Sequence, residues 1–341
     1  MNKVYSNEIV FRGHPDKVCD QISGALVDAY LGKDENSRCG IEVMGGKGKI
    51  FITGEVSSKA KVDIKKIVKR VLRDVGYSTK YKIIVNLSKQ SEDIALGVDR
   101  EGAGDQGMMF GYACNDTKEL LPKAMIILQK FAQRYDEIRK ESPKIFYADG
   151  KAQITGYYDK YFKLKKIKDF VISYQNCEKY REETDKRLNL EAKIICQKYG
   201  GEVENFHINS TGKFLIGGFD GDAGLTGRKI VVDAYQSFAN VGGGTFNGKD
   251  PTKVDLSAAY KARQIAKRYL KKYNLEWCEV QLAYAIGKRE PLSIYIDSNV
   301  GNFKNIDEKE YRECEPARII KDLKLKTKSY EKAAQFGHFR D

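Results

Sequence analysis

Three helix-like segments of this chain begin in the same way. The spacing of apolar residues predicts helices from Pro15 to about Leu31, from Pro122 to about Arg139, and from Pro251 or Val254 to Tyr273. Proline suits the first helical turn because no amide hydrogen is needed there, and a lysine follows each proline closely. Consecutive starts are separated by the length of about one small domain. The pattern therefore indicates a unit that is repeated along the chain.

A glycine-rich turn also occurs twice. Gly-Asp-Gln-Gly at residues 104–107 returns as Gly-Asp-Ala-Gly at residues 221–224, in each case downstream of a strand-like stretch. Internal duplication or triplication explains this similarity, and so does chance similarity between glycine-rich turns. The sequence leaves both explanations open.

Short runs rich in apolar and β-branched residues predict strands between the helices. The predicted strands are Ile41–Met44, Lys49–Glu55, Lys82–Leu87, Ala152–Tyr158, Ile167–Tyr174, Phe206–Ile208, Phe214–Gly217, Glu279–Ile286 and Leu292–Asp297. The first two flank Gly45–Gly48 and indicate a hairpin, and Cys177–Gly200 is predicted to be a long charged helix. Strands and helices in mixed order favour an α+β fold in which helices cover one face of each sheet.

The composition restricts the class of protein. The formal net charge is +13, but the lysines are spread along the whole chain without an arginine-rich arm, a zinc finger or an aromatic RNA-binding signature. We therefore expect anionic small molecules as partners, and no nucleic acid. Seven cysteines without a C-x-x-C pair argue against a disulfide framework and against structural zinc, so we expect buried or idle thiols.

The sequence also bears on location. No apolar run approaches the roughly 20 residues that cross a bilayer, so we expect no membrane association. Residues 1–17 contain no apolar stretch between their charges, which argues against a secretory signal. The expected location is cytoplasmic.

The segment Gly-His-Pro-Asp-Lys at residues 13–17 places three ionisable groups at the start of the first predicted helix. A helix N-terminus attracts anions through its free amides and its dipole. Lys17 adds positive charge, Asp16 is a possible Mg²⁺ ligand, and His14 is able to donate a hydrogen bond to a departing phosphate oxygen. This set suits a polyphosphate, and a helix cap with exposed charges is the equally weighted alternative.

Two glycine-rich loops carry further cations. Residues 242–255 contain three consecutive glycines, Lys249 and Lys253 four residues apart, and Asp255 as a possible metal ligand. Residues 221–229 end in adjacent arginine and lysine, which suit phosphate contacts. A flexible surface loop is the alternative for the first segment, and a solvated basic turn is the alternative for the second.

The remaining polar groups carry weaker signals. Asp149–Lys151 is predicted to be a tight turn, and His207 and His338 are expected to be packed histidines. No G-x-S-x-G or H-E-x-x-H arrangement occurs in the sequence. The sequence thus fits a reaction in which the protein positions a magnesium polyphosphate and stabilises its charge, without a covalent intermediate.

Four motifs in order resemble the S-adenosylmethionine synthetase family. Besides residues 13–17, they are Gly-Ala-Gly-Asp-Gln-Gly at 102–107, Gly-Leu-Thr-Gly-Arg-Lys at 224–229 and Gly-Gly-Gly-Thr-Phe-Asn-Gly-Lys-Asp-Pro at 242–251. The resemblance runs from about Ser6 to the Gly337-His338-Phe339 ending. It implies an α+β fold of three similar sheet-plus-helix domains with pseudo-threefold symmetry, which we predict at residues 1–100, 101–216 and 217–341. It also implies a homodimer or a dimer of dimers with active sites between subunits.

The resemblance implies synthesis of S-adenosylmethionine from ATP, L-methionine and water, with release of pyrophosphate and phosphate. In this family the methionine sulfur attacks C5′ of ATP directly, and the tripolyphosphate that leaves is then hydrolysed. Two Mg²⁺ per site and K⁺ are the implied cofactors. A non-catalytic nucleotide-binding homologue and an enzyme with tripolyphosphatase activity alone are the alternatives.

Site roles follow, residue by residue, where the motifs match. The implied ATP contacts are His14, Lys17, Asp105, Asp149, Gly150, Lys151, Lys213, Phe214, Asp222, Arg228, Lys229, Thr245 and Lys249, of which His14, Lys17, Arg228 and Lys249 are implied to be catalytic. The implied methionine contacts are Glu55, Gln90, Asp222 and Lys253. Asp16 and Asp255 are the implied Mg²⁺ ligands, and Glu42 lies at the implied K⁺ site.

Several positions depart from the family pattern. Phe11-Arg12 precede Gly13 where the family usually has small or acidic residues, Ser210 replaces a proline, and Thr245 replaces an alanine. The loop between Gln90 and Gly102 is several residues shorter than the usual lid. These changes bear on rate, lid gating and assembly more than on the type of reaction.

Overall fold

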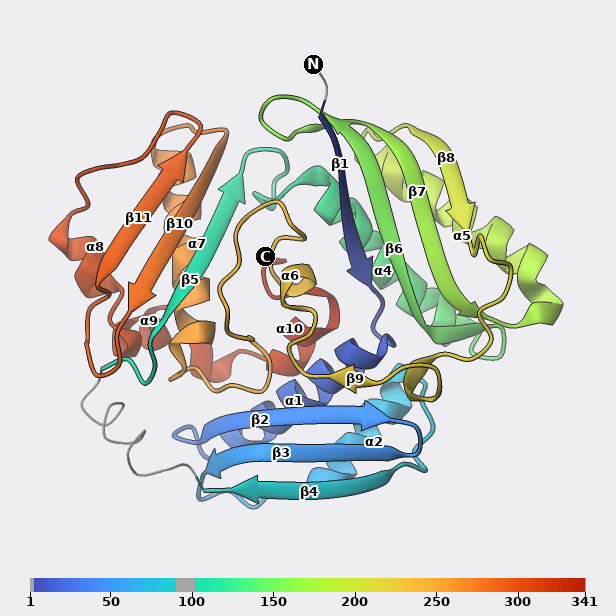
Figure 1. Cartoon of the computed structure of the whole chain (residues 1–341), viewed down its shortest axis with the longest axis horizontal. Helices are drawn as coiled ribbons and strands as arrows, with labels where there is room; N and C mark the ends of the chain where they lie inside the picture. Colours follow the sequence, from blue (N-terminus) through green and yellow to red (C-terminus); the bar gives the residue numbers. More distant parts are fainter. Residues whose placement is uncertain (1–2, 90–101, 341) are drawn as a thin grey trace.

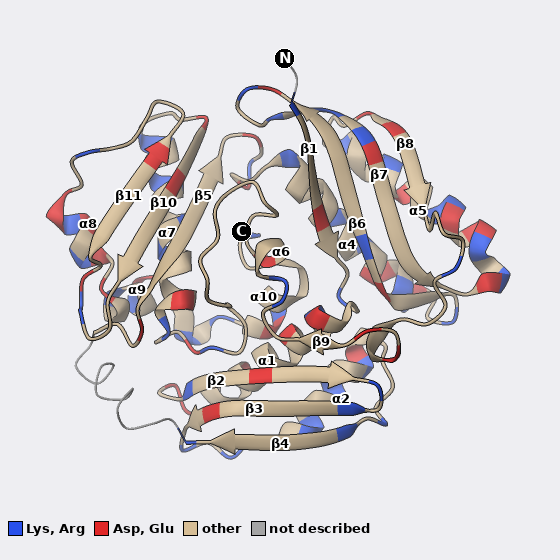
Figure 2. Cartoon of the chain, viewed as in Figure 1, with Lys and Arg blue, Asp and Glu red and all other residues tan. Residues whose placement is uncertain are grey.

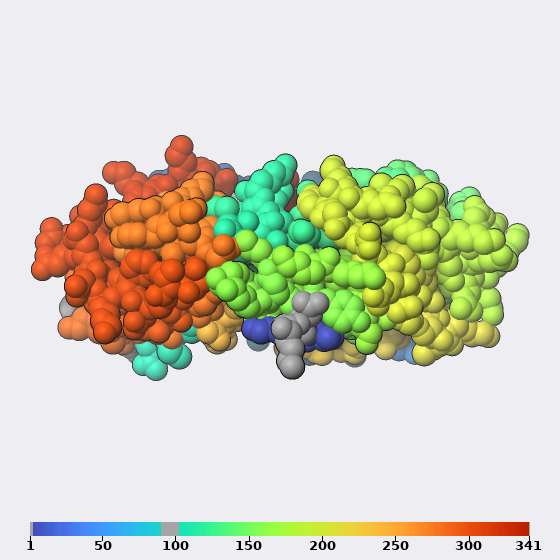
Figure 3. Space-filling view, turned by 90° about the horizontal axis from the view of Figure 1, so that it is seen from above, coloured from blue at the N-terminus to red at the C-terminus, as the bar shows by residue number. Residues whose placement is uncertain are grey.

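Three β-sheets surround the centre of the molecule, and helices pack on one side of each sheet (Figure 1). The computed structural model describes residues 3–89 and 102–340. Viewed along its edge, the molecule is flattened, with the C-terminal third of the chain at one end and the central third at the other (Figure 3).

The first sheet has the strand order β4-β3-β2-β9. Its strands are β2 (Arg38–Gly46), β3 (Lys49–Ser57), β4 (Lys82–Ser88) and the short β9 (Gly224–Leu225). β2 and β3 form the predicted antiparallel hairpin, and β4 runs parallel to β3. Helix α1 (Pro15–Leu31) packs on β2 and β9, and α2 (Ile64–Val75) packs on α1.

The second sheet has the strand order β1-β6-β7-β8. Its strands are β1 (Lys3–Val10), β6 (Phe146–Tyr158), β7 (Leu164–Asn176) and β8 (Val203–Ile208). Helix α4 (Lys123–Glu141) packs on β1 and β6, and α5 (Arg181–Lys198) packs on α4 and β8. A 3₁₀ turn at Glu178–Tyr180 precedes α5, so most of the predicted charged helix is confirmed.

The third sheet has the strand order β11-β10-β5. Its strands are β5 (Gly107–Cys114), β10 (Trp277–Tyr284) and β11 (Ser293–Ser298), and α7 (Val254–Lys272) packs on β5 and β10. The shorter helices are α6 (Ile230–Asp233), α8 (Glu308–Glu313), α9 (Pro316–Asp322) and α10 (Tyr330–Phe336), with 3₁₀ turns at Gly218–Asp220 and Leu325–Thr327.

Each sheet takes one strand from a distant part of the sequence. β9 brings residues 224–225 to the first sheet, β1 brings the N-terminal segment to the second, and β5 brings residues 107–114 to the third. Backbone hydrogen bonds therefore tie together the three regions of the chain. The division at residues 1–100, 101–216 and 217–341 stays a prediction about the sequence, because the sheets do not follow it strand for strand.

The predicted α+β class is confirmed, and α1, α4 and α7 lie where the three helices were predicted. Two local predictions are wrong. Residues 214–217 form no strand, because Ile216 is 71% exposed and Gly218 has a φ of +61°, which ends extended pairing. Residues 149–151 form no tight turn but belong to β6, where Lys151 pairs with residues of both neighbouring strands.

The cysteines are confirmed as packed thiols. All seven are free, and six of them are buried. Burial raises the pKa of Cys196 and of Cys278 to about 12, so these thiols are neutral at pH 7.

The charged residues lie mainly on the outer surfaces. Lys and Arg are interspersed with Asp and Glu on helices such as α4, α5 and α8 (Figure 2). Within residues 3–89 and 102–340, no helix has the length and apolar composition to cross a membrane.

Helix α1 is buried on almost all sides because β2, β9, α2 and α10 surround it. Its apolar residues Val18, Ile22 and Leu26 are fully buried, as the helical spacing predicts. The charged residues of its first turns are buried as well. A buried charge is costly without a partner, so the first turns of α1 require partners from the elements around them.

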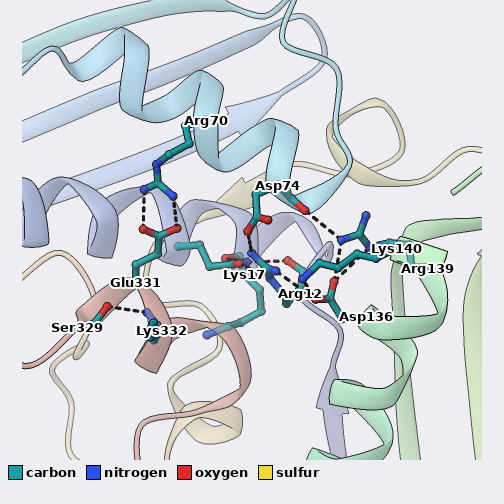
Figure 4. Close-up of polar contacts among 11 residues, drawn as sticks. Arg12, Lys17, Arg70, Asp74, Asp136, Arg139, Lys140, Ser329, Glu331 and Lys332 are labelled. Atoms are coloured by element: carbon teal, nitrogen blue, oxygen red, sulfur yellow. Dashed lines mark hydrogen bonds and ion pairs between the residues drawn. The ribbon is translucent and has the colours of Figure 1, made fainter.

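Arg12, just before α1, is itself a buried charge and has partners on three helices (Figure 4). It is 4% exposed, and its Nε donates to Gln21 Oε1 at 2.8 Å. Its guanidinium also pairs with Asp74 of α2 at 2.5 Å and with Asp136 of α4 at 3.1 Å. Arg139 and Lys140 complete the pairing of Asp136. One arginine thus joins three helices at the point where the chain enters α1.

We predict that Arg12→Ala destabilises the protein by about 3 kcal/mol, because it leaves buried carboxylate and amide groups with fewer partners. Arg70→Ala is the matched control. Arg70 also makes a bidentate carboxylate contact, with Glu331, but its side chain is 50% exposed, so its loss should cost less than about 1 kcal/mol.

Thermal unfolding followed by circular dichroism measures the difference. The midpoint should fall by about 5 °C for Arg12→Ala and change little for Arg70→Ala. Equal shifts for the two variants would contradict the role given to burial.

Candidate active site

His14 caps α1 and faces its first turn. Its backbone has φ −63° and ψ 137°, and its Nδ1 accepts the Asp16 backbone N–H at 3.2 Å. A hydrogen bond of this kind is typical of an N-cap side chain. Because Nδ1 accepts, the proton of the neutral ring is on Nε2, which is left to act as a donor.

Asp16 holds a cationic turn against this helix start. Its carboxylate is 1% exposed and accepts the Leu225 backbone N–H at 2.9 Å. Lys229 Nζ lies 2.5 Å from Asp16 Oδ2, and Arg228 Nε lies 3.5 Å from Oδ1. Gly224 allows this approach, since a Cβ there would lie 2.2 Å from the Pro15 carbonyl oxygen. The motif at residues 224–229 therefore meets the motif at residues 13–17 directly.

Burial, together with nearby cations, keeps the His14 ring neutral. Burial, and after it the nearby ammonium of Lys229, lowers the pKa of His14 to about 4, against the opposing effects of Asp16 and Asp222. Lys151 also lowers this pKa, so its charge is close enough to act on the ring. At pH 7 the site therefore contains a neutral imidazole among cations.

β6 contributes the next residues. Asp149 is 6% exposed, and its Oδ2 accepts the Gly218 backbone N–H at 2.7 Å. Burial raises the pKa of Asp149 to about 6, and the charge of Asp222 acts in the same direction. Lys213 and Phe214 lie on the segment that leads to Gly218, and the Phe214 carbonyl accepts the Asn176 N–H at 2.9 Å.

We call these residues the helix-start group. Its members are His14, Asp16, Asp149, Gly150, Lys151, Asp222, Arg228 and Lys229, with Lys213 and Phe214 on the adjoining segment. Thr245 touches the same region, because a Cβ placed on Gly227 would lie 2.8 Å from Thr245 Cβ.

Lys17 differs from the other predicted site lysines. Its side chain is 1% exposed, and its Nζ lies 2.5 Å from Asp233 Oδ1 and 3.2 Å from Asp20 Oδ2. Lys229 and Lys249, by comparison, are each 19% exposed. The sequence predicts all three as polyphosphate contacts, but the structure directs the ammonium of Lys17 into the protein.

The other predicted residues gather at a separate pocket, which we call the sheet-end pocket. It has a volume of about 620 Å³ and lies where β2 and β3 approach the start of α7. Its lining includes the predicted site residues Glu42, Glu55, Asp105, Lys249, Lys253 and Asp255. Lys249 Nζ pairs with Asp255 Oδ2 at 2.5 Å, and Lys253 Nζ pairs with Glu55 Oε1 at 3.2 Å. Burial raises the pKa of Glu42, and Lys249 opposes that rise.

The two groups meet opposite ends of β2. The sheet-end pocket includes Gly40, which bridges to Lys249, whereas β9 beside the helix-start group pairs with Met44 and Gly45. Gly40 lies four to five strand residues, or about 15 Å, from Met44 and Gly45, whereas Glu42 of the pocket lies two residues from Met44.

Three remaining predictions have different outcomes. Gln90 lies outside the described residues. The prediction that His338 is packed is confirmed. The prediction that His207 is packed is wrong, because His207 lies on the edge strand β8 and is exposed, with its Nε2 2.9 Å from Asp169 Oδ1. A further cavity of about 690 Å³ is lined by Arg38, Pro316 and Ile320 among others, and no predicted site residue lines it.

Sequence reasoning missed three buried polar residues beside the site, namely Asp20, Asp233 and Asn247. The spacing of Asp20 three residues after Lys17 was a usable signal, because such residues are neighbours on a helix face. Asp233 gave no local signal because its partner Lys17 lies 216 residues away in the sequence. Asn247 lies inside the glycine-rich motif at residues 242–251, but its bond to Asp233 depends on the fold.

Three family models match this chain in order. They describe the N-terminal domain of S-adenosylmethionine synthetase at residues 2–96, its central domain at residues 100–214 and its C-terminal domain at residues 216–341. The chain belongs to the S-adenosylmethionine synthetase family. It is also similar to a protein of Clostridium tetani named S-adenosylmethionine synthase, with 41% identity across 99% of this chain and 94% of that protein.

Membership of the synthetase family agrees with the three sheets. Each of the three matched regions supplies most strands of one sheet. The two groups of site residues come from all three regions, since residues 14–55, 105–151 and 213–255 each contribute.

We predict that the ring of His14 stays neutral well below pH 6.5, because burial and Lys229 disfavour its charged form. Nitrogen-15 NMR of histidine-labelled protein measures this, with the His14 signal identified through a His14→Asn variant. The signal should show an Nε2-protonated ring that titrates near pH 4. A midpoint near 6.5 would show that the ring is solvated and that the cap geometry is wrong.

Proposed function

We propose that this chain is a methionine adenosyltransferase that forms S-adenosylmethionine from ATP, L-methionine and water, with pyrophosphate and phosphate as the other products. The observation that carries this proposal is the helix-start group, in which the neutral His14 lies beside the cationic turn held by Asp16. Family membership over the whole chain supports it.

The first step needs no general base. The methionine sulfur uses a lone pair to form a bond to C5′ of ATP, and the C5′–O bond to the triphosphate breaks with its electron pair on oxygen. The sulfur becomes a sulfonium cation, and the tripolyphosphate gains negative charge. His14 Nε2–H donates a hydrogen bond to the departing oxygen, which is the role that its neutral tautomer allows.

The second step hydrolyses the tripolyphosphate to pyrophosphate and phosphate. Arg228 and Lys229 are positioned for the phosphate oxygens because both already contact the carboxylate of Asp16. Arginine contacts phosphate through two parallel N–H groups, and lysine acts as a point charge. The cations that stabilise the leaving group in the first step thus retain the tripolyphosphate for the second.

Magnesium fits the carboxylates that are present. Within residues 3–89 and 102–340, no group of three or more His, Cys, Asp or Glu side chains is arranged as a metal cage. Mg²⁺ commonly binds one or two carboxylates together with waters and substrate phosphates. Asp16 and Asp255 would hold two Mg²⁺ ions in this way, each in exchange for its present ammonium partner, Lys229 or Lys249. Mg²⁺ would there neutralise polyphosphate charge. Glu42, a partly buried carboxylate, would lie at a K⁺ site.

In this proposal, the sheet-end pocket binds methionine. Glu55 supplies negative charge for the amino group of methionine, and Lys253 supplies positive charge for its carboxylate. Glu55 and Lys253 pair with each other here, so the amino acid would replace that pair by two pairs of its own.

The separation of the two groups supports active sites shared between two copies of the chain. In this proposal the helix-start group of one copy faces the sheet-end pocket of another. An isologous interface of a homodimer produces two such sites, and a dimer of dimers produces four.

Product analysis tests the proposed activity. The protein is incubated with ATP, methionine, Mg²⁺ and K⁺, and the three products are separated by chromatography. Equal amounts of S-adenosylmethionine, pyrophosphate and phosphate, dependent on methionine, are expected. Phosphate release without S-adenosylmethionine would reject the synthetase activity.

We predict that His14→Ala lowers kcat for S-adenosylmethionine by about a hundredfold while the Kd for ATP changes little, since the hydrogen bond strengthens as the oxygen departs. His14→Asn is the matched control, because its amide retains both an acceptor for the cap and a donor. It should recover part of the rate. An unchanged kcat in His14→Ala would remove His14 from the reaction.

A further inference from the structure

A buried chain of polar contacts begins at Lys17. Its ammonium lies between Asp20 and Asp233, and all three side chains are almost completely buried. The other oxygen of Asp233 accepts Asn247 Nδ2 at 2.8 Å. Asn247 Oδ1 lies 2.9 Å from His338 Nε2. This Lys17 relay therefore links α1, α6, the glycine-rich loop and the C-terminal segment.

The relay holds the backbone of both cationic loops. Asp20 Oδ1 accepts the Gly227 backbone N–H at 2.9 Å, directly before Arg228. Asn247 lies two residues before Lys249, in a stretch where Gly248 has a φ of +79° and a Cβ would lie 2.0 Å from the Ile41 carbonyl oxygen. The loop at residues 224–229 and the loop at residues 242–251 are thus both joined to partners of Lys17.

The charge balance of the relay depends on Lys17. One ammonium faces two buried carboxylates, and burial raises the pKa of both Asp20 and Asp233 while Lys17 opposes the rise. The charges of Asp233 and Asp20 outweigh the effect of burial on Lys17, so its own pKa is raised and it remains protonated. At the other end of the relay, burial lowers the pKa of His338, and the charges of Lys17, Lys328 and Arg340 act in the same direction.

We infer that Lys17 is a positioning residue of the synthetase reaction and not a phosphate ligand. It acts through Asp20 on the turn that carries Arg228 and Lys229, and through Asp233 and Asn247 on the loop that carries Lys249. This inference rests on the proposed function for its effect on turnover. The burial of Lys17 and its two carboxylate contacts carry it.

A charge-compensation cycle tests the inference, with Lys17→Met, Asp233→Asn and the double variant. Lys17→Met leaves two buried carboxylates without their ammonium, so we expect the thermal midpoint to fall by more than about 5 °C. At a temperature well below that midpoint, kcat should fall about tenfold or more, with the Kd for ATP nearly unchanged. The double variant removes one of the two negative charges but leaves Asp20 without its ammonium, so it should recover part of the midpoint and of kcat.

Asp233→Asn alone is the matched control, because it keeps the contact between Lys17 and Asp20. It should cost less than Lys17→Met in both measurements. The inference is overturned if Lys17→Met keeps the wild-type midpoint and weakens ATP binding, and if the double variant is no better than the single one. These results are the ones expected if Lys17 were a phosphate ligand.

A labelling experiment on the unaltered protein gives a second test that does not depend on the folding of a variant. The protein is acetylated at low reagent concentration with and without added tripolyphosphate, and each lysine is quantified by mass spectrometry. Lys229 and Lys249 should react and be protected by tripolyphosphate, whereas Lys17 should remain unmodified in both samples. Reaction of Lys17 in the free protein, with protection by tripolyphosphate, would overturn the inference.

The outcomes separate this inference from the proposed function. If the wild-type protein forms no S-adenosylmethionine, the proposed function fails, while the thermal cycle and the labelling still report whether Lys17 is buried between the carboxylates. If the wild-type protein is active and Lys17 behaves as a phosphate ligand, the positioning role alone fails.

Discussion

The burial of the charged start of α1 is the constraint on which the rest of the structure depends. Asp16, Lys17 and Asp20 are almost completely buried, so each needs a partner of opposite charge. Their partners come from residues 224–233, while Arg12 beside them reaches α2 and α4. The three parts of the chain therefore have to assemble before these charges are satisfied. The same pairing brings Arg228 and Lys229 to His14.

The pairing of strands from distant parts of the chain also holds these residues together. β9 is only two residues long, yet it ties the cationic turn to the edge of the first sheet beside α1. β1 leads from the second sheet directly into the segment that carries His14. Strand pairing thus fixes both sides of the helix-start group in the chain without a ligand.

Local patterns were sufficient for the four longest helices and for most strands, but they did not predict α2, the four short helices, or the strands β1, β5 and β9. The proline starts, the helical spacing and the hairpin glycines are properties of neighbouring residues, and α1, α4, α7 and the β2–β3 hairpin follow from them. Asp149 and Gly150 suggested a turn because they are turn formers, but pairing with strands on both sides outweighed that preference. The partners of Lys17 and the division of the site depend on contacts between distant residues, and single-sequence periodicity contains no information on them. The motifs indicated the family, and the fold brings the predicted site residues together in two groups.

The central claim is that the helix-start group of one copy works with the sheet-end pocket of another. The most direct measurement uses a His14→Ala chain and a Lys249→Ala chain with different affinity tags. Each homo-oligomer should form S-adenosylmethionine slowly. Mixed oligomers, isolated by both tags in succession after co-expression, should recover a substantial part of wild-type turnover, because one of the two shared sites then contains both native groups. Mixed oligomers that remain as slow as either parent would contradict the claim and would place both groups in a site within a single chain.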